Sequence, residues 1–258
     1  MSDVLVERDG PIRTVVLNRP DRMNALSQAM WGELGRVVAE INADDSCRCV
    51  VFRGQGRKAF AAGADITEFP EIRRNAEEAR AYNKPLTAAI EAIEACPHPA
   101  VAMIHGPCMG SALAIAARCD LRLAGAGARF GARISRLGST MPVAEMRALV
   151  DLVGPTGASE ILIEGRILDA DDALRLGIVN RVVDDDALEA ETGATVARIL
   201  EGAPLVNRMH KKLLRRLRDH TPLGREDEKL GYVLCDTADY RTGISAFVAK
   251  TKPDFKGE

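Results

Sequence analysis

Two short turns rich in small residues are the segments of this chain best suited to chemistry. The first covers residues 59–66 (AFAAGADI), and the second covers residues 105–112 (HGPCMGSA). Glycine and alanine leave the backbone open, so a ligand can approach the N–H groups closely. Two N–H donors from separate turns are what an oxyanion hole requires. The pair therefore predicts a site that stabilises negative charge on a carbonyl oxygen.

Alternating strand and helix patterns must position these turns. We expect strands over residues 4–7, 12–17, 49–53, 100–104 and 121–123, and helices over residues 28–41 (with Ser27 as N-cap), 76–95 and 112–118. Strand–turn–helix–strand alternation predicts an α/β fold with crossover connections. Charged helical patterns over residues 205–218 and 226–234 predict a helical C-terminal piece.

Length and composition exclude several classes of protein. The 258 residues are 47% hydrophobic but only 4% aromatic, which predicts one domain with an aliphatic core and leaves room for an appendage. A net charge of −2 gives no field that would attract nucleic acid or an anionic membrane. The six cysteines show no disulfide spacing, and no signal peptide or membrane span is evident, so we expect reduced thiols and a cytoplasmic protein. His210 and His220 are expected to be solvated.

Further segments extend the pattern of the two turns along almost the whole chain. They are residues 18–26 (NRPDRMNAL), 58–66 (KAFAAGADI), 99–106 (PAVAMIHG), 119–122 (CDLR), 129–131 (RFG), 164–166 (EGR), 173–180 (ALRLGIVN) and 246–257 (AFVAKTKPDFKG). In this order they resemble the crotonase (enoyl-CoA hydratase/isomerase) superfamily.

The resemblance implies a fold, an assembly and a ligand. The fold is a spiral of ββα units with two nearly perpendicular sheets over residues 1–190, followed by a helical trimerisation region over residues 191–258. Homotrimers or hexamers made of two trimers are implied. The implied ligand is an acyl thioester of coenzyme A, which belongs to the substrate, and neither a prosthetic group nor a metal is expected.

By position in the family pattern, the oxyanion donors are the N–H groups of Ala64 and Ser111. Ser111 stands at the start of the expected buried helix, where the helix dipole also favours negative charge. Serine replaces the glycine that is usual there, and its hydroxyl could crowd the carbonyl or donate an extra hydrogen bond. The alternative is that both segments are merely tight turns.

The resemblance also assigns contacts with coenzyme A. The residues concerned are Arg22, Met23, Ala62, Asp65, Ile66, Phe247 and Lys250. The last two belong to the C-terminal tail, which in the family often reaches the cofactor of a neighbouring subunit. Asp65 could instead cap the following helix, and the cationic side chains could be solvated.

The chain departs from the family at the acid–base positions. Typical hydratases of the family carry one glutamate three residues beyond the second donor, which is Ala114 here. They carry the other where this chain has Ile134. Neither side chain can transfer a proton. We therefore expect the usual hydration reaction to be absent or very slow.

Other groups could transfer a proton or bind the acyl group. Glu145 belongs to a segment that lies over the acyl pocket in the family, although a carboxylate is also favourable in the first turn of a helix after Pro142. Arg133 and Arg136 could bind a second carboxylate on the acyl group or form ion pairs. His105 could be a base, but the family usually places a structural polar residue there.

Three functions remain open on the sequence. The first is an acyl-CoA lyase or isomerase that stabilises an enolate and performs isomerisation, decarboxylation or hydrolysis through Glu145 or substrate groups. The second is a non-catalytic acyl-CoA-binding protein or structural subunit. The third is a true hydratase that draws its acids from other positions. A dinucleotide site is disfavoured, because the glycines lack the G-x-G-x-x-G spacing.

Overall fold

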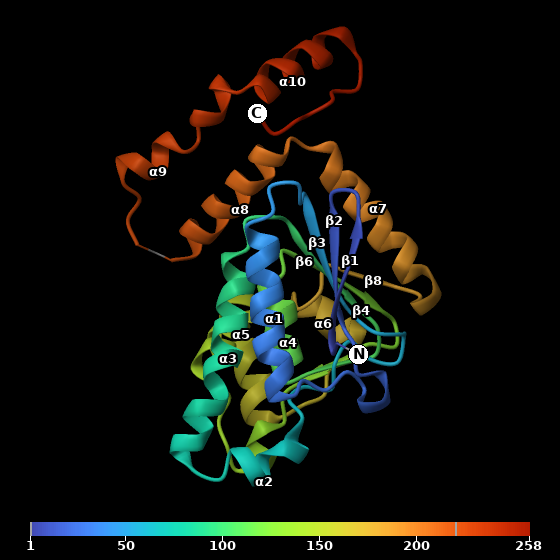
Figure 1. Ribbon diagram of the computed structural model, residues 1–258, viewed down its shortest axis with the longest axis vertical. Helices are drawn as coiled ribbons and strands as arrows, with labels where there is room; N and C mark the ends of the chain where they lie inside the picture. The colour runs from blue at the N-terminus through green and yellow to red at the C-terminus, as the bar shows by residue number, and fades with distance from the viewer. Residues whose placement is uncertain (1, 220) are drawn as a thin grey trace.

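A six-stranded sheet forms the centre of the molecule in the computed structural model, which describes residues 2–219 and 221–258 (Figure 1). The expectation for His220 therefore lies outside the described residues. The strands, in spatial order, are β1 (Val4–Asp9), β2 (Ile12–Leu17), β3 (Cys49–Gly54), β4 (Ala100–Ile104), β6 (Leu121–Gly125) and β8 (Arg181–Val183). β1 and β2 form an antiparallel hairpin, and the remaining neighbours are parallel. The α/β expectation is confirmed.

A second, two-stranded sheet lies beside the first. It pairs β5 (Pro107–Met109) with β7 (Arg129–Gly131) in parallel. Both strands are only three residues long, and β5 lies inside the second small-residue turn, so no alternation pattern revealed it. The two sheets agree with the fold that the family resemblance implies.

Helices cover both faces of the large sheet. On one side lie α1 (Gln28–Asn42), α3 (Ala76–Ala95), α4 (Ser111–Arg118) and α5 (Val143–Ser159), and on the other lies α7 (Leu188–Glu201) (Figure 1). Short helices α2 (Phe69–Ile72) and α6 (Ala170–Arg175) complete the body. The Ser27 hydroxyl accepts the N–H of Met30 at 3.2 Å, as expected of an N-cap.

Two apolar layers hold these helices to the sheet. The larger contains Trp31 of α1, Phe52 of β3 and Tyr82 of α3, all fully buried. The smaller packs Leu188 and Val196 of α7 against the opposite face. Because the central strands β3 and β4 are covered on both sides, their sequences are almost continuously apolar. The domain boundary expected at residue 190 falls inside α7, which packs on the sheet with the body of the molecule.

The C-terminal segment forms an arm of α8 (Pro204–Arg218), α9 (Arg225–Lys229) and α10 (Ala238–Ala249). In Figure 1, α9 and α10 stand away from the sheet and its covering helices. The helical C-terminal piece is confirmed, but the pattern over residues 226–234 is interrupted: α9 ends at Lys229, and a separate 3-10 turn covers Val233–Asp236. Gly231, a poor helix former, occupies the break, where its N–H bonds the Glu228 carbonyl.

The described helices include none that is both long and apolar enough to cross a membrane.

Candidate functional site

Backbone hydrogen bonds join the two small-residue turns. The Ala61 N–H donates to the Pro107 carbonyl at 3.1 Å, and the Met109 N–H donates to the Ala61 carbonyl at 3.0 Å. On the other side, the Leu26 N–H donates to the Gly63 carbonyl at 2.8 Å. The first turn is thus hydrogen-bonded on one side to the second turn and on the other side to Leu26. These bonds fix the backbone around Gly63 and Ala64 next to the start of α4.

Two glycines make this close approach possible. Gly63 has φ +97°, and a Cβ there would lie 2.9 Å from the Met109 carbonyl oxygen. Gly110 has φ +53° and immediately precedes α4. Left-handed φ values of this kind are unfavourable for residues with side chains. The two turns can therefore meet only because glycine occupies these positions.

The N–H groups of Ala64 and Ser111 hydrogen-bond to no other described residue. Both residues line one cavity of about 560 Å³. Ser111 is the first residue of α4, so its N–H lies at the positive end of the helix dipole. Backbone donors that lack a protein partner are available to a ligand or to water. The geometry thus allows both groups to donate to a ligand in the cavity.

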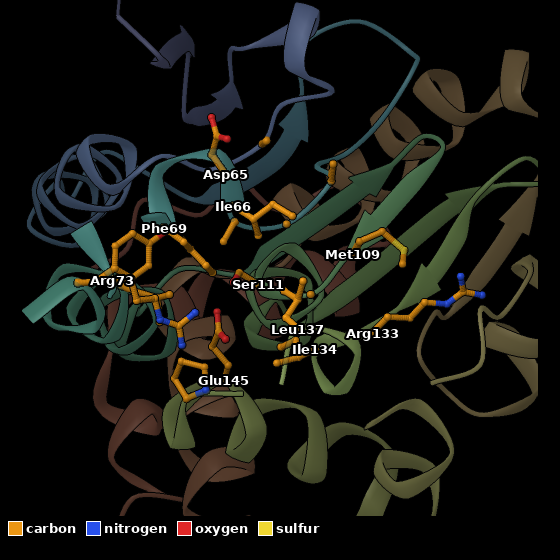
Figure 2. A pocket seen from close by; sticks show the side chains of 18 of the residues that line it. Asp65, Ile66, Phe69, Arg73, Met109, Ser111, Arg133, Ile134, Leu137 and Glu145 are labelled. Carbon is orange, nitrogen blue, oxygen red and sulfur yellow. The ribbon is translucent and has the colours of Figure 1, made fainter. Parts of the chain in front are cut away.

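The cavity is enclosed by the two turns, the segment around α2, the middle of α3, the 3-10 segment Ile134–Leu137, and the start of α5 (Figure 2). Its lining is mainly apolar or backbone. The polar side chains on the lining are those of Arg22, Asp65, Arg73, Tyr82, Asn83, Ser111, Arg133, Arg136, Thr140 and Glu145.

Glu145 is the most unusual of these side chains. It lies in the first turn of α5 after Pro142, as the sequence predicts, yet only 1% of it is exposed. Neither carboxyl oxygen makes a well-formed hydrogen bond within the described chain. Burial raises the pKa of Glu145 to about 7, opposed by the nearby Ser111 hydroxyl and the positive charge of Arg73. Figure 2 shows its carboxyl group pointing toward Ser111, with the Arg73 guanidinium beside it.

Asp65, the other carboxylate on the lining, is occupied elsewhere. It accepts the N–H and hydroxyl of Thr67 and forms an ion pair with Arg19 at 2.9 Å. The Thr67 hydrogen bonds and Arg19 lower its pKa. Its carboxylate points away from Ser111 and Glu145 (Figure 2). Asp65 therefore stands as a helix cap and ion-pair partner, the alternative that the sequence left open.

The two replaced positions lie differently around the cavity. Ile134 contributes to the lining, whereas Ala114 is buried in α4 and does not. Neither places an ionisable group in the site. His105 is also outside the lining, with its Nδ1 3.8 Å from Asp185 Oδ1, and burial lowers its pKa.

The expected coenzyme A contacts divide into two groups. Arg22, Ala62 and Ile66 line the cavity, and Met23 is next to it, with its carbonyl accepting the Ala62 N–H at 3.0 Å. The tail residues Phe247 and Lys250 lie at the end of α10, at the opposite end of the molecule from α2 (Figure 1). A single chain therefore does not bring them to this cavity.

Sequence reasoning missed Arg73, which follows α2. Its guanidinium lies 4.6 Å from the centroid of the Phe69 ring and 5.9 Å from that of Tyr82. Arg133, by contrast, donates to the Gly165 carbonyl at 3.2 Å and points away from Glu145 (Figure 2). No local pattern marked Arg73, because its place depends on contacts with a ring from α3.

Comparison with known proteins shows the family to which the chain belongs. The model of the enoyl-CoA hydratase/isomerase family matches residues 7–258, so the chain belongs to this family. The crotonase resemblance and fold class are thereby confirmed. A solved structure described as an enoyl-CoA hydratase/carnithine racemase from Magnetospirillum magneticum superposes with a TM-score of 0.97 and 47% identity, covering 100% of this chain and 97% of that one.

Two curated relatives show the range of activities nearby. The short-chain-enoyl-CoA hydratase of Clostridium acetobutylicum is 31% identical over 255 residues, covering 98% of this chain and 97% of the relative. The mitochondrial delta(3,5)-delta(2,4)-dienoyl-CoA isomerase of Dictyostelium discoideum is 29% identical over 261 residues, covering 95% of this chain and 87% of the relative. The similarity thus extends to proteins named as hydratases and to one named as an isomerase.

Proposed function

We propose that this protein is an acyl-CoA isomerase that moves a proton by way of a thioester enolate. The N–H groups of Ala64 and Ser111 donate to the thioester oxygen, and Glu145 removes and returns the proton. The observation that carries the proposal is Glu145 itself: a buried carboxyl group beside the Ser111 hydroxyl that makes no well-formed hydrogen bond within the described chain. A pKa near 7 suits a group that must both accept and donate a proton.

The proposed reaction needs one carboxyl group. For a 3-enoyl thioester, the Glu145 carboxylate takes a proton from C2, and negative charge spreads to the thioester oxygen, where two N–H donors stabilise it. The same carboxyl group returns the proton at C4, and the double bond moves from C3–C4 to C2–C3. Hydration would also require a group to activate water, and neither Ala114 nor Ile134 can do so.

Coenzyme A enters this proposal as part of the substrate. Arg22, Ala62 and Ile66 lie on the cavity wall and serve its phosphates and pantetheine arm, with Met23 next to them. Phe247 and Lys250 would have to come from a neighbouring copy of the chain, because they lie far from the cavity of their own chain. No prosthetic group or metal has a role in the steps above.

Hydration is the second candidate, because relatives such as that of Clostridium acetobutylicum are named hydratases. In that case Glu145 would serve both to activate water and to deliver the proton. A non-catalytic acyl-CoA-binding protein is the remaining alternative.

One incubation separates these functions. Purified protein is mixed with trans-3-hexenoyl-CoA and crotonyl-CoA in deuterated water, and the products are read by mass spectrometry and chromatography. The proposal predicts 2-hexenoyl-CoA, with deuterium incorporated and activity lost in Glu145→Gln. A product carrying added water would identify a hydratase, and unchanged substrates with bound acyl-CoA would identify a binder.

A further inference from the structure

Arg73 places a positive charge in the cavity. It is half-buried and lines the cavity between Phe69 and Tyr82, whose rings meet edge to face with centroids 5.4 Å apart. Cation–π contact with both rings fixes the guanidinium in place. The aromatic pair thus holds the cation at the cavity wall.

The cation is left largely uncompensated. Of its N–H groups, the one hydrogen bond within the described chain joins Nη2 to the Ser139 hydroxyl at 3.3 Å. No described carboxylate forms an ion pair with it, although most other arginines of the body have such partners. Glu145 lies close enough for the charge of Arg73 to lower its pKa, but burial disfavours the charged form of Glu145. A half-buried guanidinium with free donors is costly unless an anion binds it.

We infer that Arg73 binds a carboxylate on the acyl group, so that the substrates are coenzyme A thioesters of dicarboxylic acids. This inference rests on the proposed function for the position of the thioester at Ala64 and Ser111. Figure 2 shows Ser111, Glu145 and Arg73 as neighbours along one side of the site. An acyl chain that starts at Ser111 passes Glu145 and brings its far carboxylate to the guanidinium.

The other cations of the lining fit this role less well. Arg133 points away from Glu145 and is bonded to the Gly165 carbonyl. Arg22 belongs to the flank near Ala62, where coenzyme A is expected. Arg136 is solvent-exposed in the segment Ile134–Leu137, so water screens its charge. Arg73 is the cation held by aromatic rings inside the cavity.

Binding of saturated thioesters tests the inference without any chemistry. Isothermal titration calorimetry compares succinyl-, glutaryl- and adipyl-CoA with butyryl-, pentanoyl- and hexanoyl-CoA. One dicarboxylic ligand should bind roughly 10- to 100-fold more tightly than its uncharged counterpart, as expected for a charge-assisted hydrogen bond. Arg73→Met should remove this preference while keeping affinity for the uncharged series.

Arg74→Met is the matched control. Arg74 is next in sequence and carries the same charge, but it pairs with Glu78 at 2.6 Å on the surface and does not line the cavity. It should leave the preference intact. Arg73→Lys, which keeps the charge but not the paired N–H groups, should retain part of the preference. If Arg73→Met fails to fold, the comparison of the two ligand series on the wild-type protein still tests the inference.

Two results would overturn the inference. The first is wild-type protein that binds both series equally or prefers the uncharged one. The second is a preference that survives Arg73→Met but disappears in Arg136→Met. The two proposals can fail separately. If the wild-type protein shows no isomerase activity in the deuterium experiment but prefers dicarboxylic ligands in calorimetry, the proposed reaction is refuted and the acyl recognition by Arg73 stands.

Discussion

At the scale of single residues, Glu145 determines how activity should vary with pH. Proton abstraction needs the ionised carboxylate, and burial raises its pKa to about 7. The value of kcat/KM for a 3-enoyl-CoA should therefore rise about tenfold per pH unit below 7 and level off above it. Glu145→Gln should lower turnover by about 10²- to 10⁴-fold. A profile that is flat between pH 5 and 8 would assign the proton transfer to another group.

The same residue should influence stability in the opposite sense. Its carboxyl group has a higher pKa in the folded protein than the ordinary 4.5, so the folded state holds the proton more firmly than the unfolded state. Stability is then full below pH 4.5 and declines as pH rises to about 7, where the carboxylate must be buried in charged form. Raising the pKa from 4.5 to about 7 corresponds to roughly 3 kcal/mol.

Glu145→Gln should abolish this decline. The variant should be more stable than wild type at pH 8, by up to about 3 kcal/mol, and similar to it at pH 4.5. Urea unfolding at both pH values measures the difference. If Glu145→Gln lowers the free energy of unfolding equally at pH 4.5 and pH 8, Glu145 stabilises the folded state rather than destabilising it.

The sequence predicts the site residues unequally. Ala64 and Ser111 follow from a local signal, because small residues on tight turns are visible in the chain itself. Glu145 could be proposed from its position after Pro142, but its complete burial depends on packing against other elements. Arg73 carries no local signal, since its setting depends on rings from α2 and α3.

At the scale of elements, the contact between the two turns should tolerate no side chain at Gly63. Gly63→Ala adds a left-handed φ strain of about 1–2 kcal/mol. It also adds a Cβ only 2.9 Å from the Met109 carbonyl, so the turns must separate. We expect a clear loss of stability together with a loss of activity, because Ala64 is the next residue. Thermal unfolding and the isomerase assay measure the two effects.

Gly56→Ala is the matched control for this prediction. Gly56 also has a positive φ, +70°, but a Cβ there would meet no atom within 4 Å. Gly56→Ala should lose stability only through the unfavourable positive φ, and it should keep activity. Equal effects of the two substitutions on activity would contradict a special role for the contact between turns.

Most of the elements that position the site follow from local patterns. The helix 76–95 and the strand 100–104 are found with the expected bounds, because an amphipathic run and a continuous apolar run each specify one structure. The strands β5 and β7 could not be predicted, since three-residue strands depend on a partner brought by the fold. The break at Gly231 was missed because surrounding charged residues keep a helical pattern.

At the scale of the whole molecule, the C-terminal arm exposes apolar side chains that a solvated monomer would not favour. Phe247 is 84% exposed, Val248 76% and Tyr232 73%. Apolar groups gathered on an extended arm mark a surface for association. The family resemblance implies a trimer or a hexamer, and a neighbouring copy is also the source that the proposed function requires for Phe247 and Lys250.

The protein should therefore behave as three or six copies of its 27.8 kDa chain in light scattering after size-exclusion chromatography. Phe247→Asp should shift it toward smaller species, because a charge at the centre of an apolar contact must be desolvated. Ile163→Asp changes a residue of similar exposure, 80%, on the body of the molecule, and it should leave the assembly unchanged. If the tail completes the site of a neighbour, Phe247→Asp should also raise KM for acyl-CoA. A wild-type protein that remains monomeric with full activity would show that each chain binds coenzyme A by itself.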